Sequence, residues 1–191
     1  MRRTIHLLVA LPLLAACTTD YITPPASAFN PPPSTPLSAF ENVELQAVTI
    51  AEPYSAHEKN IAAAAKIQEN LVVNLTNLIS VWNTDSGGAA TMGTLVIEPV
   101  VTQIKFISAS GRVMAGAMAG SSAVVMVVTL RQKETGTVVG APEFFQRAQA
   151  MAGAYTFGAH DNMMLTRVAK LVSDYVQANY LAAVGGATGV E

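Results

Sequence analysis

Two pairs of adjacent polar residues are the first places where this chain could do chemistry. His160 followed by Asp161 could supply a general base together with the carboxylate that orients it. Neighbouring residues in a chain rarely point to the same place, however, and no nucleophile accompanies them. Ser121 and Ser122 lack the Gly-x-Ser-x-Gly pattern of a serine hydrolase. We therefore interpret His160 as a surface residue beside a helix start, and we expect no enzyme activity.

Metal and acid–base chemistry have little support elsewhere in the chain. Apart from His160, the only histidine after residue 6 is His57, and a zinc site would need a third ligand at a suitable spacing. Glu98 and Glu143 are both expected in strands, where they could face each other as a carboxylate pair. We favour a different role, as lone charges at a sheet edge that discourage aggregation. The sequence predicts no metal and no cofactor.

The glycine-rich segment 111–122 (GRVMAGAMAGSS) is the most unusual stretch. Gly116 and Gly120 have the spacing that lets helices pack closely in lipid, but the segment is too short to span a membrane and contains Arg112. It also lacks the lysine and the strand–loop–helix context of a phosphate-binding loop. A flexible connection is the simplest interpretation. The alternative is a partner-binding or self-assembly loop comprising Gly111, Arg112, Gly116 and Gly120, because Met and Gly suit adaptable contacts.

An aromatic cluster follows this segment in the chain. Its members are Phe144, Phe145, Tyr155 and Phe157, with glycines between them. Packing in the core is the expected role, and exposure at a binding surface is the alternative.

The only cysteine, Cys17, ends an apolar run of a recognisable kind. Two arginines precede the apolar stretch 7–14, which is the order of a secretory signal. A transmembrane helix needs about 20 apolar residues, and this run is roughly half that length. Residues 1–16 are therefore predicted to be an export signal that is cut off.

The sequence Leu14-Ala15-Ala16-Cys17 is similar to the lipobox of bacterial lipoproteins. The resemblance implies that Cys17 becomes the first mature residue and carries lipid, with palmitate among its acyl chains. Each buried methylene contributes about 0.8 kcal/mol, so several chains hold firmly. In Gram-negative lipoproteins an aspartate after the cysteine favours the inner membrane, and Thr18 therefore implies the outer membrane, facing the periplasm. An ordinary signal peptide with a chance cysteine is the alternative.

Residues 17–40 are predicted to be the lipidated cysteine and a proline-rich tether. Six prolines between residues 18 and 40 disfavour helices and sheet ladders. At about 3.1 Å per residue, such a spacer could hold a domain up to ~70 Å from the membrane. A docking strip for a partner that recognises proline-rich segments is the alternative.

The composition of the remaining chain excludes one class of partner. Without Arg2 and Arg3, nine Lys and Arg face thirteen Asp and Glu, so the net charge is −4. There is no basic stripe, and nucleic acid is not expected as a partner. The mean hydropathy of the whole chain is +0.36, which is high and leaves ample apolar surface for a core.

Residues 41–182 are predicted to form a single α/β domain, followed by a flexible tail at 183–191. The first half comprises a strand at 43–50, an amphipathic helix at 56–82 begun by a capping box of Ser55 and Glu58, and a strand at 94–107. Pro99 places the last of these at an edge or a bulge.

The second half begins with the strand 123–132, which is apolar on both faces. Such a strand is normally central and covered twice, or lies in an oligomer interface. A turn at 133–136, a returning strand at 137–150 and a closing helix complete the domain. Asp161 is expected to cap that helix, and Gly185 and Gly186 to end it. The order predicts a two-layer α/β (α+β) sandwich with a mixed sheet and both helices on one face.

This order, together with the segment GRVMAGAMAGSSAVVMVVTL, the ETG turn and the closing helix with Asp-Asn-Met-Met, resembles a family of uncharacterised bacterial outer-membrane lipoproteins. The resemblance implies a fold similar to the periplasmic domain of the curli secretion channel and to the amino-terminal domain of the Tol-system periplasmic protein. It brings no established activity.

We therefore expect a lipoprotein without catalytic activity that binds a protein partner or assembles with copies of itself. By analogy of fold alone, it could instead be a subunit of an export or envelope assembly. A third hypothesis is a lipid-binding or small-ligand-binding transport protein that uses the apolar sheet face.

Replacing the sulfur of Cys17 tests the anchor directly. We expect Cys17→Ser to abolish metabolic labelling with palmitate and to move the protein from the membrane fraction to the soluble fraction, because a hydroxyl is not acylated there. Wild-type levels in the membrane fraction for the variant, or no label on the natural chain, would contradict the hypothesis.

Overall fold

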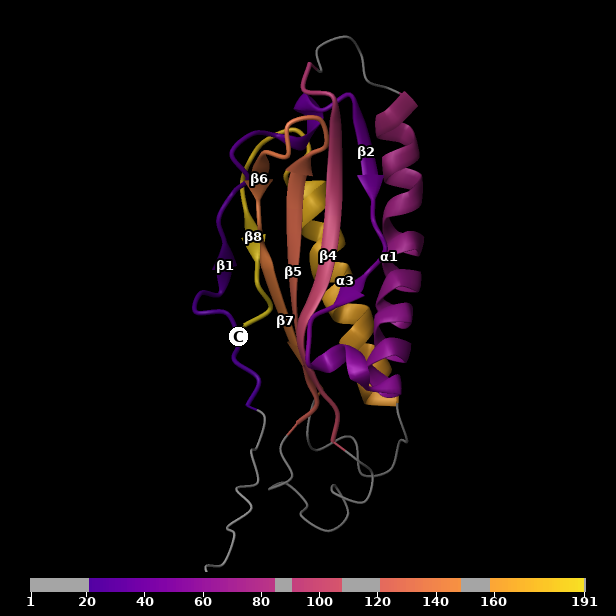
Figure 1. Ribbon diagram of the computed structural model, residues 1–191. Helices are drawn as coiled ribbons and strands as arrows, with labels where there is room; N and C mark the ends of the chain where they lie inside the picture. The colour runs from indigo at the N-terminus through magenta and orange to yellow at the C-terminus, as the bar shows by residue number, and fades with distance from the viewer. Residues whose placement is uncertain (1–20, 85–90, 108–120, 149–158, 191) are drawn as a thin grey trace, which may run out of the picture.

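The computed structural model describes residues 21–84, 91–107, 121–148 and 159–190. Its centre is a long antiparallel pair of strands, β4 (Thr94–Lys105) and β5 (Ala123–Gln132). These belong to a six-stranded mixed sheet in the order β2-β4-β5-β6, with β3 also pairing with β4 and β7 with β5 (Figure 1).

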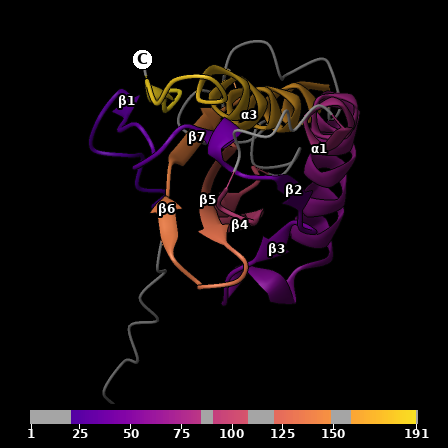
Figure 2. The same cartoon turned by 90° about the horizontal axis from the view of Figure 1, so that it is seen from above.

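Both described α-helices lie against the same face of this sheet. They are α1 (Glu58–Thr84) and α3 (Ala159–Ala178), which pack on each other as well as on the strands (Figure 2). The buried side chains between the two layers form the main core. The predicted two-layer α/β sandwich with helices on one face is thereby confirmed.

The central strand β5 is covered on the helix face along most of its length and on the outer face in its first half. Val124, Met126, Val128 and Leu130 are fully buried on the helix side. On the other side, Ala123 and Val125 are buried together with Phe145 in a second, smaller cluster. Ile22 and Val190, from the two ends of the described chain, pack against this second cluster.

The predicted first strand, 43–50, is interrupted. It forms β2 (Asn42–Leu45) and β3 (Thr49–Ile50), both parallel to β4. Between them the chain leaves the sheet, and the side-chain oxygen of Gln68 on α1 accepts the N–H of Val48 at 2.7 Å. Pro99 lies on β4 opposite this interruption, where its missing N–H costs no ladder bond.

The predicted returning strand is also split. It forms β6 (Val138–Gly140) and β7 (Glu143–Arg147), both antiparallel to β5, and the carbonyl of Pro142 between them accepts the Val128 N–H at 3.0 Å. The turn before β6 is confirmed, with Gly136 at φ 72°.

Two predictions at the helix ends are wrong. Ser55 lies in the 3-10 helix η2 (Tyr54–Ala56) and donates its hydroxyl hydrogen to Glu52, so it does not cap α1. The closing helix stops at Ala178 rather than at the glycines. Asn179 ends it: its side-chain oxygen accepts the N–H groups of Val184 and Gly185, both at 2.8 Å.

The predicted tether and flexible tail are folded against the domain over most of their length. β1 (Phe29–Asn30) pairs antiparallel with β8 (Gly186–Ala187), and the 3-10 helix η1 (Leu37–Ala39) follows. The side chains of Leu37 and Phe40 are buried in the main core. The prolines do limit regular ladders, but the residues between them bury enough surface to fix the segment.

Asparagine side chains protect both edges of the sheet. On β7, the Asn30 amide donates to the Glu143 carbonyl and accepts the Glu143 N–H, both at 2.8 Å. On β2, the Asn83 amide accepts the Val43 N–H at 2.8 Å and donates to the Val43 carbonyl at 3.1 Å. Each amide thus takes the place of a neighbouring strand, which discourages pairing with another chain.

Asn30→Ala and Asn83→Ala should each lower the free energy of unfolding by about 1–3 kcal/mol, because two backbone groups lose their partners. Urea unfolding measures the loss. Asn74→Ala is the matched control, since Asn74 is exposed on α1 and alanine is the better helix former. Equal unfolding midpoints for all three variants would show that the edge amides contribute nothing.

Candidate functional site

The residues that the sequence nominates most strongly lie outside the described part of the chain. They are Cys17 and the loop residues Gly111, Arg112, Gly116 and Gly120, together with Tyr155 and Phe157 of the aromatic cluster. The two other members of that cluster, Phe144 and Phe145, are buried, as the core interpretation predicts.

Ser122 binds the two described residues that precede segments 108–120 and 149–158, which are Ile107 and Ala148. It is fully buried, and its hydroxyl oxygen accepts the Ile107 N–H at 3.0 Å across segment 108–120. Its carbonyl accepts the Ala148 N–H at 2.8 Å, immediately before segment 149–158. Ser122 is therefore a structural residue, in agreement with the absence of a hydrolase pattern around it.

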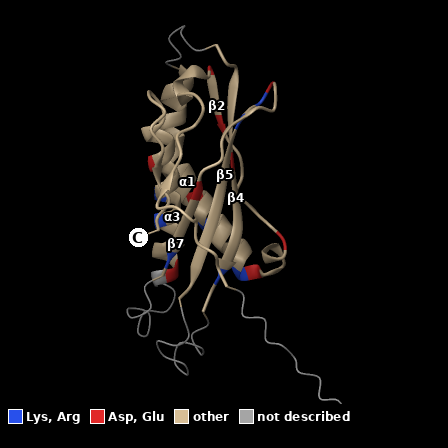
Figure 3. Cartoon of the chain, turned by 90° about the vertical axis from the view of Figure 1, so that its left-hand side faces the viewer, with Lys and Arg blue, Asp and Glu red and all other residues tan. Residues whose placement is uncertain are grey.

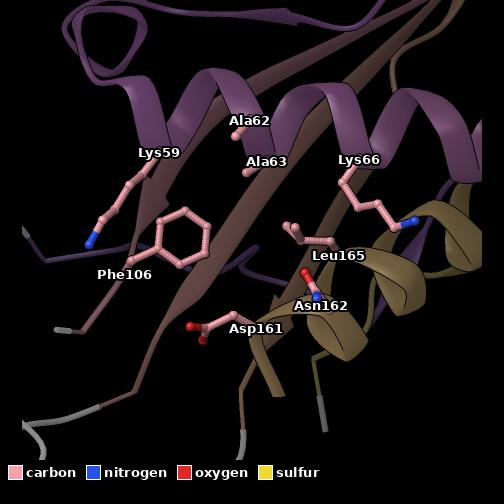
Figure 4. A pocket seen from close by; sticks show the side chains of 8 residues that line it. All are labelled: Lys59, Ala62, Ala63, Lys66, Phe106, Asp161, Asn162 and Leu165. Carbon is pink, nitrogen blue, oxygen red and sulfur yellow. The ribbon is translucent and has the colours of Figure 1, made fainter. Parts of the chain in front are cut away.

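A pocket of about 300 Å³ opens between the first turns of the two helices, at this same end of the sheet. Its lining combines small and apolar side chains with a polar rim, and comprises Lys59, Ala62, Ala63, Lys66, Phe106, Asp161, Asn162 and Leu165 (Figure 4). The alanines of α1 leave the space, and Phe106, just after β4, places its ring beneath them.

This pocket suits a small and largely apolar ligand. Its volume is at the lower limit of the sites that hold small molecules, roughly 300–1,000 Å³. On the rim, the Lys66 ammonium forms an ion pair with Glu69 at 2.8 Å. The predicted ligand site was the apolar sheet face instead. The alanine run 62–65 was the sequence feature that could have indicated this pocket, because small side chains between two helices leave space for a ligand.

Of the two histidines, only His57 has a described side chain. His57 is exposed and directly precedes α1. Its carbonyl accepts the Ile61 N–H at 3.1 Å, in the first turn of that helix. Because α3 begins at Ala159, Asp161 lies in its first turn rather than at its cap, and the side chain of His160 lies outside the described part. Among the described residues, no group of three His, Cys, Asp or Glu could hold a metal ion.

Glu98 and Glu143 lie on the outer face of the sheet, opposite the helices. Their cross-strand neighbours on β5 are Thr129 and Val127. The expectation that both are lone edge charges is wrong for Glu98, because β4 is an inner strand and the Glu98 carboxylate pairs with Arg131 at 3.2 Å. Charged residues are otherwise scattered over the molecule (Figure 3).

The clearest perturbed acid lies at the opposite end of the sheet from the pocket. Glu134, in the turn after β5, receives the Thr94 N–H on its two carboxylate oxygens, at 3.0 and 3.1 Å. These hydrogen bonds lower the pKa of Glu134 below its usual 4.5. The group is fully exposed, and we assign it to closing the turn rather than to chemistry.

Comparison with known proteins identifies a family without an assigned function. A model described as "Domain of unknown function (DUF4410)" matches residues 30–154, and no curated protein matches the chain. Within the described residues, neither helix has the length and apolar character needed to cross a membrane.

Three solved structures show weak similarity. The PelC dodecamer from Paraburkholderia phytofirmans has 11% identity and a TM-score of 0.38, over 71% of this chain and 89% of that one. A candidate lipoprotein from Caulobacter crescentus CB15 has 14% identity and a TM-score of 0.32, over 74% and 90%. A hypothetical protein from Chlamydia trachomatis has 10% identity and a TM-score of 0.37, over 72% and 98%. Such values establish neither a shared fold nor a shared assembly.

The structural role of Ser122 is testable against its neighbour. Ser122→Ala should lower the free energy of unfolding by about 1–3 kcal/mol, because the partly buried Ile107 N–H loses its acceptor. Ser121→Ala is the control, since Ser121 is only half-buried. Thermal unfolding of both variants measures the difference, and equal midpoints would refute the assignment.

Proposed function

This chain belongs to the DUF4410 family of unknown function, and we propose that it is a lipid-anchored protein of the bacterial envelope that binds protein and catalyses no reaction. The proposed anchor is Cys17, in the outer membrane, with the domain facing the periplasm. The lipobox-like sequence supports the anchor. The surface of the second half of α1 supports protein binding.

That surface is the observation on which the proposed function depends. From residue 70 to residue 84, α1 carries no charged side chain. Val73 is 72% exposed, Val81 57% and Val72 43%. The exposed residues between them are neutral polar ones: Asn74, Thr76, Asn77 and Ser80. We call this surface the valine face.

An exposed helix face of this kind is unusual for a surface that only meets water. Solvated faces of amphipathic helices normally carry charged residues. Valine is also a poorer helix former than Lys or Glu, so helix propensity does not explain it. Depletion of charge, in contrast, is the compositional signal of the buried centre of an interface.

A second copy of the chain is the partner that the valine face fits best. In a two-fold interface the same patch lies on both sides, so a charged residue would lie near the same charged residue of the other copy. A neutral face avoids that repulsion. Pairing through β7 or β2 is less favoured, because it would have to displace the Asn30 amide from Glu143 or the Asn83 amide from Val43. Membership of a larger export or envelope assembly would use the same face.

The pocket supports a second candidate function. Its apolar floor of Ala62, Ala63, Phe106 and Leu165 would accept part of a lipid or another small apolar molecule. This function predicts a bound small molecule and does not require self-association.

Charge placed on the valine face tests self-assembly. The chain from residue 18 onward should be a dimer or larger oligomer by light scattering, and Val73→Glu with Val81→Glu should convert it to a monomer. Glutamate is a better helix former than valine, so the fold should survive. Ile61→Glu is the matched control: it is 55% exposed on α1 but lies beside charged residues, and it should stay oligomeric.

Native mass spectrometry of the same samples separates the two functions. An oligomer without adducts supports the valine face as the functional surface. A monomer at all concentrations would refute self-assembly, and a monomer with a bound lipid-sized mass would favour the pocket.

A further inference from the structure

The amino-terminal segment is fastened to the domain from Ile22 onward, and from this we infer that the domain lies directly against the bilayer, with one defined corner facing the lipid headgroups. The inference rests on the proposed anchoring at Cys17. We call the corner formed by Ile22, Gln103, Ala123 and Arg147 the entry corner.

The first contacts of the described chain form this corner. The Ile22 side chain packs against the cluster of Ala123, Val125 and Phe145 on the outer face of the sheet. The next residue, Thr23, donates its N–H to the side-chain oxygen of Gln103 at 2.9 Å. Arg147 is exposed and lies opposite Ala123 in the sheet.

The segment stays fixed between the entry corner and β1. Thr188, near the carboxyl terminus, donates its hydroxyl hydrogen to the Ser27 carbonyl at 2.7 Å and its N–H to the Ala28 carbonyl at 3.0 Å. Thr188 is itself buried, and its carbonyl accepts the Phe145 N–H at 2.7 Å. The two chain ends therefore hold each other on the outer face of the sheet.

Beyond β1, the segment is tied to the sheet edge and to α3. The Tyr175 hydroxyl donates to the Pro31 carbonyl at 2.8 Å, and burial raises the pKa of this hydroxyl to about 12, so it stays protonated. The Ser34 N–H bonds to the Val139 carbonyl at 2.7 Å, and the Leu37 N–H to the Asn179 carbonyl at 3.0 Å. No part of this segment is left to act as a long spacer.

The free length of the tether is therefore short. Five residue steps separate Cys17 from Ile22, and a fully extended chain covers about 17 Å in that distance. A tether that stayed free to residue 40 would reach ~70 Å. Helix α1, with 27 residues, is itself about 40 Å long. The anchor thus holds the entry corner within about 17 Å of the bilayer, which is less than the length of helix α1.

This geometry divides the molecule into a membrane side and a free side. The end of β4, the start of β5 and the start of α1 lie at the same end of the molecule (Figure 1). The entry corner is at this end because it contains Gln103 of β4 and Ala123 of β5, and the pocket is there because it is lined by Phe106 and the first turns of α1. The second half of α1, with the valine face and Trp82, lies toward the other end. The pocket therefore opens toward the lipid, and the valine face remains accessible to protein.

The single cysteine and single tryptophan of the chain permit a direct test. The chain beginning at Cys17 is coupled through its thiol to a maleimide lipid in vesicles that contain a dansyl-labelled lipid. Energy transfer is measured from Trp82, and from a tryptophan at the entry corner in the variant Arg147→Trp with Trp82→Phe. We expect a clearly larger loss of tryptophan emission at position 147 than at position 82.

A lengthened tether is the control. Twelve Gly and Ser residues inserted between Tyr21 and Ile22 leave every contact of the fastened segment intact. They add a flexible linker with a root-mean-square end-to-end distance of about 20 Å. The insertion should reduce transfer from position 147. Equal transfer from both positions, with no effect of the insertion, would overturn the inference. Because the coupling is chemical, a failure of palmitate labelling in cells would refute the proposed anchor and leave this result unaffected.

Discussion

The apolar character of β5 on both faces is the constraint that shapes this domain. A strand of this kind must be covered twice, since each exposed valine-sized side chain would forgo about 1.5–3 kcal/mol of burial. Two helices cover one face. Among the described residues no third helix lies on the other face, and Ile22 and Val190 cover its first half, at Ala123 and Val125, instead. Gly189 permits this approach: it has φ +88°, and a Cβ there would lie 2.2 Å from the Phe145 carbonyl oxygen.

The spacing of apolar residues in the sequence correctly predicted the central strand and the first helix. The strand 123–132 has the predicted bounds, and the helix predicted at 56–82 begins and ends two residues later. The breaks within the first and last strands depend on contacts with distant residues, such as Gln68, and no local pattern reveals them. The pocket was missed for the same reason, because it combines two helices with Phe106 from the end of a strand.

The proline-rich segment shows where a compositional rule fails. Its average composition is that of a spacer. A rule based on average composition gives no weight to the single residues that attach the segment to the domain. Asn30 is 4% exposed and Leu37 is fully buried, and each occupies a place that only the folded sheet creates. Prolines limit the number of ladder bonds, so side chains supply part of the attachment. The Asn30 amide does so with the same donor and acceptor pair that a strand would offer.

The same segment connects the two proposals. By bonding to the β7 edge it hinders association through that strand, and Asn83 does the same at β2, which favours a helix face for protein contacts among the described residues. By starting at the entry corner it also determines how the domain is presented under the proposed anchoring. A protein that stood on a long free tether could meet partners in any orientation. One held at its entry corner presents the valine face in a restricted set of orientations, and neighbours anchored in the same bilayer share them. Restricting two partners to a plane and to similar orientations lowers the entropy that association must overcome, so even a modest neutral face would suffice for assembly.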